Sequence, residues 1–194
     1  MELSVLHLLS QRPLLTGSGT TLDAMIFEGQ GQNLRQAVVV GVPHGDSIEA
    51  PGGIDSKWVY PLSFERAALD FPVPGMSDVM PYRSTCFSDM NRAMLDHYLA
   101  AWTEHLNKAI SDFQPDVIHS HHLWWLSALV KDVAPHIPVV SHCHGTGLRQ
   151  FQLCPHWCEE IAEKLRRNDA FVLLHRGQLP AVKKLLEVDD KKLF

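Results

Sequence analysis

Residues 116–150 read DVIHSHHLWWLSALVKDVAPHIPVVSHCHGTGLRQ, and this stretch decides the fold. It contains a short apolar strand over residues 116–120, a helical pattern over 123–133 and a second strand over 138–142. A helix between two short buried strands predicts a right-handed βαβ unit with parallel strands. Histidines and glycines follow both strands directly, at the edge of the sheet where such folds bind ligands.

The same alternation extends toward both ends of the chain. Further strands are predicted over residues 3–9, 35–42, 57–62 and 170–174, and further helices over 20–30, about 88–114, 157–167 and 178–188. Prolines and a glycine interrupt the pattern between residues 63 and 87, which predicts a long irregular segment. We therefore expect one α/β domain over residues 1–194, a doubly wound and mainly parallel sheet with helices on both faces.

The composition excludes several classes of protein. The 194 residues carry a net charge of −5, so the basic face typical of nucleic-acid binding is not expected. No apolar run in the sequence reaches the length of a transmembrane segment. Four cysteines in a chain of this size do not form a disulfide framework. These observations predict a cytoplasmic protein, with attachment to a membrane surface left open.

The turn after the first strand, residues 16–19 (TGSG), suits a diphosphate. Gly17, Ser18 and Gly19 would let the backbone approach a ligand closely at the N-terminus of the following helix. The dinucleotide fingerprint is incomplete, because Leu22 stands in the place of its third glycine and no carboxylate follows the second strand. An NAD site is therefore disfavoured, and the alternative to a phosphate site is a tight turn alone.

The clustered histidines allow two interpretations. HSHH (119–122) and HCH (142–144) offer imidazoles at metal-ligand spacing, which would suit a metal-dependent hydrolase. No Asp or Glu lies near either cluster, so we expect no metal ion. The same residues can instead bind sugar hydroxyls, helped by the polar side chains of Thr146, Arg149 and Gln150.

Three segments together resemble the N-terminal half of the family 4 glycosyltransferases. They are residues 6–25, residues 116–150 and residues 169–178, in the same order along the chain. The resemblance implies a Rossmann-like domain that forms one half of a GT-B fold, in which this half mainly receives the acceptor. It implies a nucleotide-sugar donor as co-substrate, no cofactor, no metal ion and retention of stereochemistry.

The resemblance also implies roles for individual residues. His144 matches the catalytic position that touches the reacting sugar and the acceptor, and Gly17 to Gly19 match a loop near the donor diphosphate. His119, His121 and His122 match a loop that shapes the acceptor pocket. Gly147 departs from the family pattern, which often has Asp at this position.

Relatives of this family continue into a second domain that binds the donor. We therefore expect the missing C-terminal domain of the same polypeptide to be a necessary partner, and the 194 residues to transfer no sugar alone. Three alternatives stay open: half of a sugar-nucleotide epimerase of the same fold, the metal-dependent hydrolase, and a non-catalytic sugar-binding module. The epimerase would need carboxylates for proton abstraction where the sequence has histidines.

Overall fold

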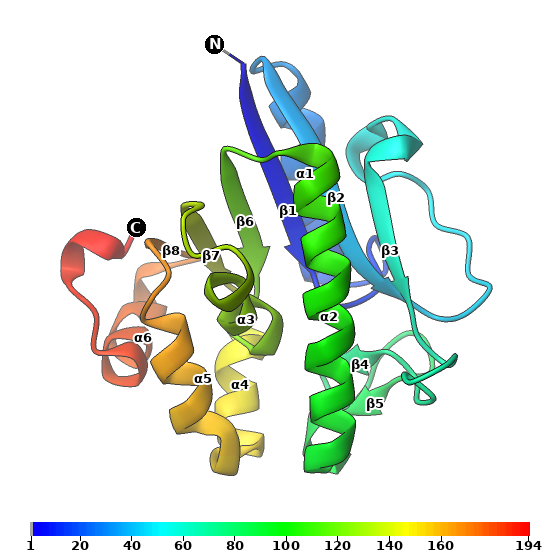
Figure 1. Ribbon diagram of the computed structural model, residues 1–194. Helices are drawn as coiled ribbons and strands as arrows, with labels where there is room; N and C mark the ends of the chain where they lie inside the picture. Colours follow the sequence, from blue (N-terminus) through cyan, green and yellow to red (C-terminus); the bar gives the residue numbers. More distant parts are fainter. Residues whose placement is uncertain (1) are drawn as a thin grey trace.

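The computed structural model describes residues 2–194, and its centre is a six-stranded sheet in which all neighbouring strands run parallel (Figure 1). The spatial order is β3-β2-β1-β6-β7-β8. These strands span Leu3–Leu9 (β1), Leu34–Val42 (β2), Val59–Ser63 (β3), Val117–His121 (β6), Val139–Cys143 (β7) and Ala170–Leu173 (β8). The order reverses between β1 and β6, and a crevice for ligands forms outside the strand ends at such a point.

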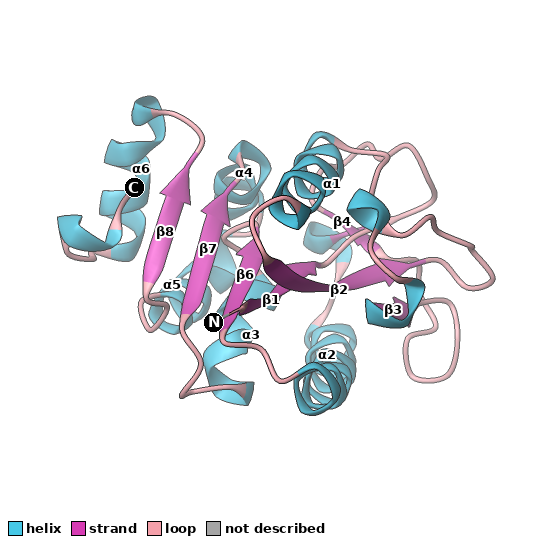
Figure 2. Cartoon of the chain, turned by 90° about the horizontal axis from the view of Figure 1, so that it is seen from above, coloured by secondary structure: helices cyan, strands magenta, loops and turns pink. Residues whose placement is uncertain are grey.

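Helices cover both faces of the sheet, which confirms the predicted fold class. Figure 2 shows α1 (Gly17–Gln30) on one side and α2 (Arg92–Phe113), α3 (Trp125–Val133) and α5 (Cys158–Leu165) on the other. Alternate residues of the strands serve the two layers: Val38 and Val40 pack with α1, whereas Leu6 and Leu8 join the larger core that contains α2 and α3. A further helix of the second half, α6 (Leu179–Leu186), adds Val182 and Leu186 to that larger core.

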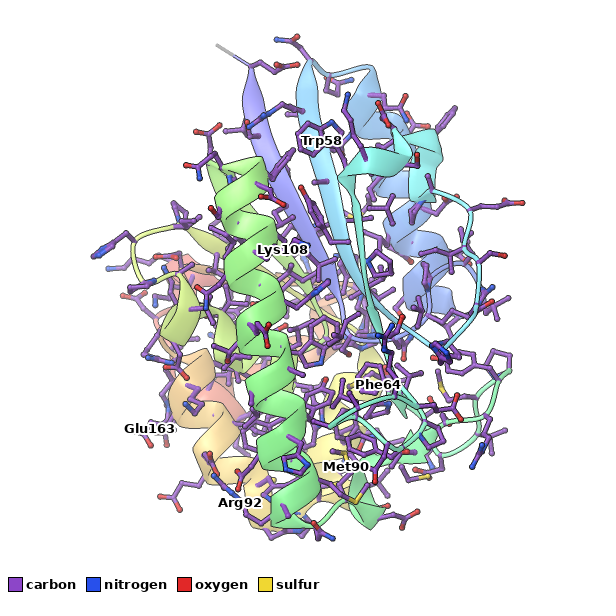
Figure 3. All side chains as sticks on the ribbon, turned by 45° about the vertical axis from the view of Figure 1, so that its right-hand side comes forward. Trp58, Phe64, Met90, Arg92, Lys108 and Glu163 are labelled. Carbon is purple, nitrogen blue, oxygen red and sulfur yellow. The ribbon has the colours of Figure 1, made fainter. Side chains whose placement is uncertain are left out.

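Helix α2 forms most of the wall on its side of the sheet. Tyr98, Trp102 and Leu106 recur at four-residue spacing on one face of this helix, and all three are fully buried. Phe64, which follows β3, packs against Tyr98 and Trp102. Figure 3 shows Phe64 beside α2. The helix begins at Arg92 instead of near residue 88, because the Asn91 side chain accepts a hydrogen bond from the Met94 amide and caps the first turn.

The segment between residues 63 and 87 is irregular, as predicted, apart from two short strands. These strands, β4 (Pro74–Gly75) and β5 (Thr85–Cys86), pair with each other and stay outside the main sheet. Val73 and Met76 are buried and anchor the segment against the core. This anchoring holds the segment at the carboxyl edge of the sheet, where it contributes to the cavity described below.

Two predicted loops are helical instead. Gly17 to Gly19 form the first turn of α1, because the Thr16 hydroxyl accepts a hydrogen bond from the Gly19 amide at 3.2 Å. Residues 145–150 belong to an additional helix, α4 (Gly145–Leu153), although glycine is a poor helix former. Contacts distant in sequence stabilise α4: Phe151 packs edge-on against Trp124. Over residues 2–194, no helix combines the length and the apolar character that crossing a bilayer requires.

Candidate functional site

A cavity of about 570 Å³ opens at the carboxyl ends of β1 and β7. Its wall combines the turn after β1, the start of α1, the irregular segment and the turn after β7. The lining residues are Gln11, Thr16, Gly17, Ser18, Thr21, Met76, Ser77, Met80, His144, Gly145, Thr146 and Leu174. The turn at Gly17 and Ser18 and the turn at His144 and Gly145, separated by more than a hundred residues, therefore meet at this cavity.

His175, which follows β8, does not line this cavity. It lines a separate hollow with Arg176 and Phe194.

The N-termini of two helices, α1 and α4, contribute to this cavity. Both the Gly17 turn and the Gly145 turn line it, and a Cβ atom added at either glycine would meet no other atom within 4 Å. Unpaired amides and the partial positive charge at a helix N-terminus favour an anion. The cavity can therefore accept a negatively charged group between two such helix ends.

Gly19 has a different reason to be glycine. A Cβ atom there would lie 2.6 Å from the backbone nitrogen of Leu14 and 3.1 Å from the carbonyl carbon of Pro13. Gly19 therefore permits close packing of the preceding loop and does not line the cavity. Of the three residues predicted to approach a phosphate, Gly17 and Ser18 line the cavity, whereas Gly19 packs against the loop that precedes the helix.

Gln11 connects three parts of the cavity wall, although it belongs to none of the sequence motifs described above. Its Nε2 group donates to the Thr16 hydroxyl at 2.9 Å and to the Ser18 hydroxyl at 2.9 Å, while its Oε1 atom accepts from the Met76 amide at 3.2 Å. The side chain is buried, so these bonds replace its contacts with water. Its place after a buried strand was the available signal, but only the fold shows its partners.

Histidine rings form a buried ladder along β6 and β7. His121 and His142 are paired in register. His119 lies two residues before His121 on β6, and His144 lies two residues after His142, just past the end of β7. The Nδ1 atom of His121 lies 2.9 Å from Nε2 of His144, and the rings of His142 and His144 stack with centroids 4.7 Å apart. His144 alone of these rings lines the cavity, and the others lie behind it.

Burial keeps these rings neutral near pH 7. Loss of solvation lowers the pKa of His144 to about 4, with a smaller contribution from the nearby charge of protonated His142. The pKa values of His119, His121 and His122 lie well below the ordinary value, chiefly because of burial and secondarily because neighbouring histidines repel a second charge. A neutral ring at His144 can donate one hydrogen bond and accept another.

The other predicted binding residues are distributed around the cavity. Thr146 lines the cavity, and its hydroxyl lies 3.1 Å from Nδ1 of His122. His122 is buried and does not line the cavity. Arg149 is exposed and pairs with Asp78 at 3.2 Å. Gln150 is buried and donates to the Met76 carbonyl at 3.2 Å. Thr146 thus joins His144 at the cavity, whereas Gln150 positions the irregular segment and Arg149 lies outside.

The strand order and the helices on both faces define a doubly wound α/β domain with a cavity at the carboxyl ends of its strands. The model of Glycosyltransferase Family 4 matches residues 83–190, which is more than half of the chain. The chain therefore belongs to glycosyltransferase family 4, and its fold is that of an N-terminal GT-B domain. No curated protein sequence matches it significantly.

Solved structures show the same fold at low sequence identity. Sucrose-phosphate synthase from Thermosynechococcus elongatus has 10% identity and a TM-score of 0.59, and the match covers 99% of this chain and 47% of that one. UDP-GlcNAc 2-epimerase from Neisseria meningitidis, bound to UDP-GlcNAc, has 14% identity and a TM-score of 0.58, with 99% and 45% covered. The corresponding epimerase from Rickettsia bellii has 13% identity and a TM-score of 0.54, with 100% and 44% covered. The chain thus spans less than half the length of these proteins.

Proposed function

We propose that this domain forms the acceptor side of a glycosyltransferase that moves a sugar from a nucleotide-sugar donor to an acceptor. The observation that carries the proposal is the meeting of two helix N-termini and the neutral His144 ring in one cavity. The family match supports it, because it covers the strand and the turn that carry His144. A second domain of the same polypeptide, which would hold most of the donor, completes the site in this proposal.

The geometry suggests how the domain would assist transfer. As the nucleoside diphosphate leaves, negative charge grows on its phosphate oxygens, and the N-terminus of α1 at Gly17 and Ser18 would stabilise that charge. His144 would orient the sugar hydroxyls or the acceptor through a hydrogen bond of Nδ1, because its Nε2 atom is bonded to His121. Thr146 would add a hydroxyl at the same wall. In this proposal the transfer needs no metal ion or cofactor, and it retains the configuration of the sugar.

Glycosyl transfer suits this cavity better than epimerisation of a sugar nucleotide or metal-dependent hydrolysis. Within residues 2–194, the side chains that line the cavity include no carboxylate, which an epimerase would use to remove a proton. A metal-dependent hydrolase would need an ion that reaches the substrate, and of the candidate trio His121, His142 and His144 only one member, His144, lines the cavity. We place the enzyme in the cytoplasm, since its cysteines are free thiols.

The experiment uses the natural polypeptide that contains this domain, with a panel of nucleotide sugars and acceptors. We expect transfer by that polypeptide and none by residues 1–194 alone. His144→Ala should lower kcat/KM roughly 100-fold, because a lost positioning contact misplaces the reacting groups. His97→Gln, a change at an exposed histidine of α2, is the matched control. Full turnover by the His144→Ala variant would refute the role of His144, and turnover by the isolated chain would refute the need for a second domain.

A further inference from the structure

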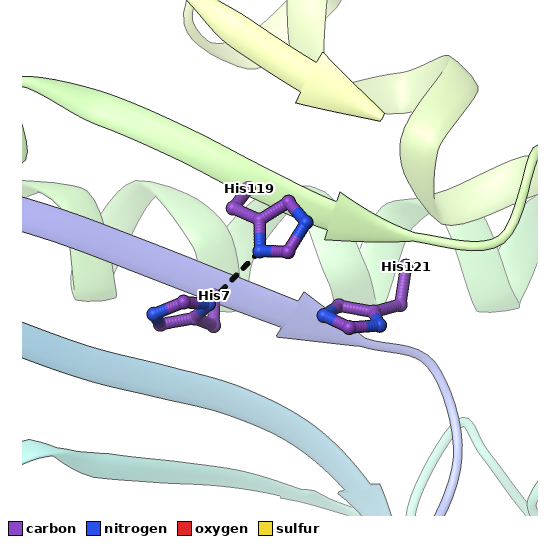
Figure 4. Close-up of side chains that lie close together, drawn as sticks. All are labelled: His7, His119 and His121. Carbon is purple, nitrogen blue, oxygen red and sulfur yellow. Dashed lines mark hydrogen bonds between the residues drawn. The ribbon is translucent and has the colours of Figure 1, made fainter. Parts of the chain in front are cut away.

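A third strand brings another histidine to the ladder. His7 lies on β1, directly beside His119 of β6, and its ring also faces His121 (Figure 4). One ring nitrogen from each of His7, His119 and His121 lies within 4.8 Å of the other two. All three side chains are buried. His7 belongs to neither of the two histidine motifs of the sequence, HSHH (119–122) and HCH (142–144).

Two ring nitrogens of this trio are already almost as far apart as two ligand atoms of one metal ion. The Nδ1 atoms of His7 and His119 are 3.1 Å apart, and the rings are inclined by 75°. A tetrahedral Zn²⁺ ion, with bonds of about 2.1 Å, separates its ligand atoms by about 3.4 Å. A small outward movement of the two rings would therefore admit an ion between them.

In two of these rings, those of His7 and His121, the nitrogen that points away from the trio makes a hydrogen bond. The Gln36 amide donates to the Ile26 carbonyl at 2.9 Å, so its Oε1 atom faces His7 and accepts from Nε2 at 3.1 Å. His7 consequently carries its proton on Nε2, and its Nδ1 lone pair accepts a hydrogen bond from Nδ1 of His119, whose proton a metal ion would displace. His121 has the equivalent arrangement if its Nδ1 donates to His144 at 2.9 Å. Metal-bound histidines are held in this way by an acceptor on the second ring nitrogen.

One nitrogen of the trio has no partner. The Nε2 atom of His121 is buried and makes no hydrogen bond within the described residues, 2–194. Figure 4 shows this ring with one nitrogen directed toward His7 and His119. An unpaired buried polar atom is costly, and the cost would be removed by a ligand shared with the two neighbouring rings.

We propose that His7, His119 and His121 bind one divalent transition-metal ion, of which Zn²⁺ is the representative, between β1 and β6. Three imidazoles without a carboxylate suit Zn²⁺, Ni²⁺ or Cu²⁺ and disfavour Mg²⁺ and Ca²⁺. The ion would crosslink the two strands at the point where the strand order reverses. It would contact His144 only through His121, so it supports the floor of the cavity and touches no substrate. This assignment departs from the expectation that the chain holds no metal ion.

The test measures binding of ZnCl₂ to the chain purified without a polyhistidine tag and stripped with a chelator. Calorimetry should give one Zn²⁺ ion per chain, and thermal unfolding should shift to a higher Tm when Zn²⁺ is added. Co²⁺ should give the intense visible absorption of a tetrahedral site. MgCl₂ should produce none of these effects. A wild-type chain that is folded by circular dichroism and binds no Zn²⁺ would overturn the proposal.

Variants locate the ion. His7→Gln and His119→Gln should each weaken Zn²⁺ binding about 100-fold, and Gln36→Leu should weaken it about 10- to 100-fold by freeing the His7 ring. The exposed His97→Gln control should bind as the wild type does. His142→Gln tests the neighbouring trio of His121, His142 and His144, which could also hold an ion. Loss of binding in His142→Gln with retention in His7→Gln would overturn the assignment.

Circular dichroism and the metal-free Tm of each variant distinguish lost ligands from lost folding. If His7→Gln does not fold, His119→Gln and the Co²⁺ spectrum of the wild type carry the test. Because no nucleotide sugar is present in these measurements, their outcome is independent of the proposed glycosyl transfer.

Discussion

The Nδ1 atom of His121 lies 2.9 Å from the Nε2 atom of His144, so a buried ring on β6 directly supports the ring that lines the cavity just after β7. His144 has no other hydrogen-bond partner from a side chain in the part of the chain that the structure describes. The orientation of the proposed catalytic ring therefore depends on a residue that does not line the cavity.

This support predicts the effect of His121→Leu in the natural polypeptide. The leucine fills space behind His144 but cannot hold its Nε2 atom, so kcat should fall about tenfold with a smaller change in KM. The measurement is steady-state kinetics in the presence of a chelator, which removes any contribution of a bound ion. A variant that changed only KM would show that His121 does not position His144.

Two glycines of the same turn should respond differently to alanine. Gly17→Ala places a methyl group in the open cavity and should raise the KM for the nucleotide sugar without lowering Tm. Gly19→Ala places it 2.6 Å from the Leu14 nitrogen, which should cost about 2 kcal/mol and lower Tm by about 4–8 °C. Kinetics of the natural polypeptide and calorimetry of the domain check the pair. Equal losses of stability would contradict the distinction.

Asn168 should be the most sensitive polar residue of the second half. It is fully buried, and its Nδ2 group donates to the Ser127 carbonyl at 3.0 Å and to the Ser141 hydroxyl at 2.9 Å. Asn168→Ala leaves both acceptors without this donor and should destabilise the domain by about 3 kcal/mol. Asn107→Ala, on the exposed side of α2, should change stability by less than about 0.5 kcal/mol. Urea denaturation of both variants is the measurement.

The tyrosines should resist ionisation in the folded domain. Burial raises the pKa of Tyr82 to about 12, and it raises the pKa values of Tyr60 and Tyr98 as well. These are the three tyrosines of the chain. The folded state holds their protons more tightly than the unfolded state, so stability should fall as pH rises from about 10 toward 12.

Near-ultraviolet absorbance during alkaline titration checks this expectation. The native domain should show little tyrosinate at pH values where the chain in denaturant is already half ionised. Ionisation of all three tyrosines near pH 10 in the native domain would contradict the burial described for Tyr82 and Tyr98.

The fold class follows from local patterns in the sequence. Short runs such as residues 3–9 and 35–42 are mainly apolar on both alternating sets of positions, which is typical of a strand covered on both faces. The large apolar residues of α2 have the spacing of one helical face, and Tyr98, Trp102 and Leu106 are buried as that spacing predicts. Because glycines and histidines directly follow such strands, their gathering at one edge of the sheet was also predictable.

The sequence by itself determined the parallel sheet and the location of the site, since both depend on the order and periodicity of neighbouring residues. Only the tertiary structure decided which side chains meet there. Helix α4 forms in a glycine-containing segment because Phe151 packs against Trp124. Gln11 connects the turn after β1 to the irregular segment by accepting a hydrogen bond from the Met76 amide. His7 reaches His119 across 112 residues of sequence. Such contacts depend on the packing of distant segments, which no local pattern specifies.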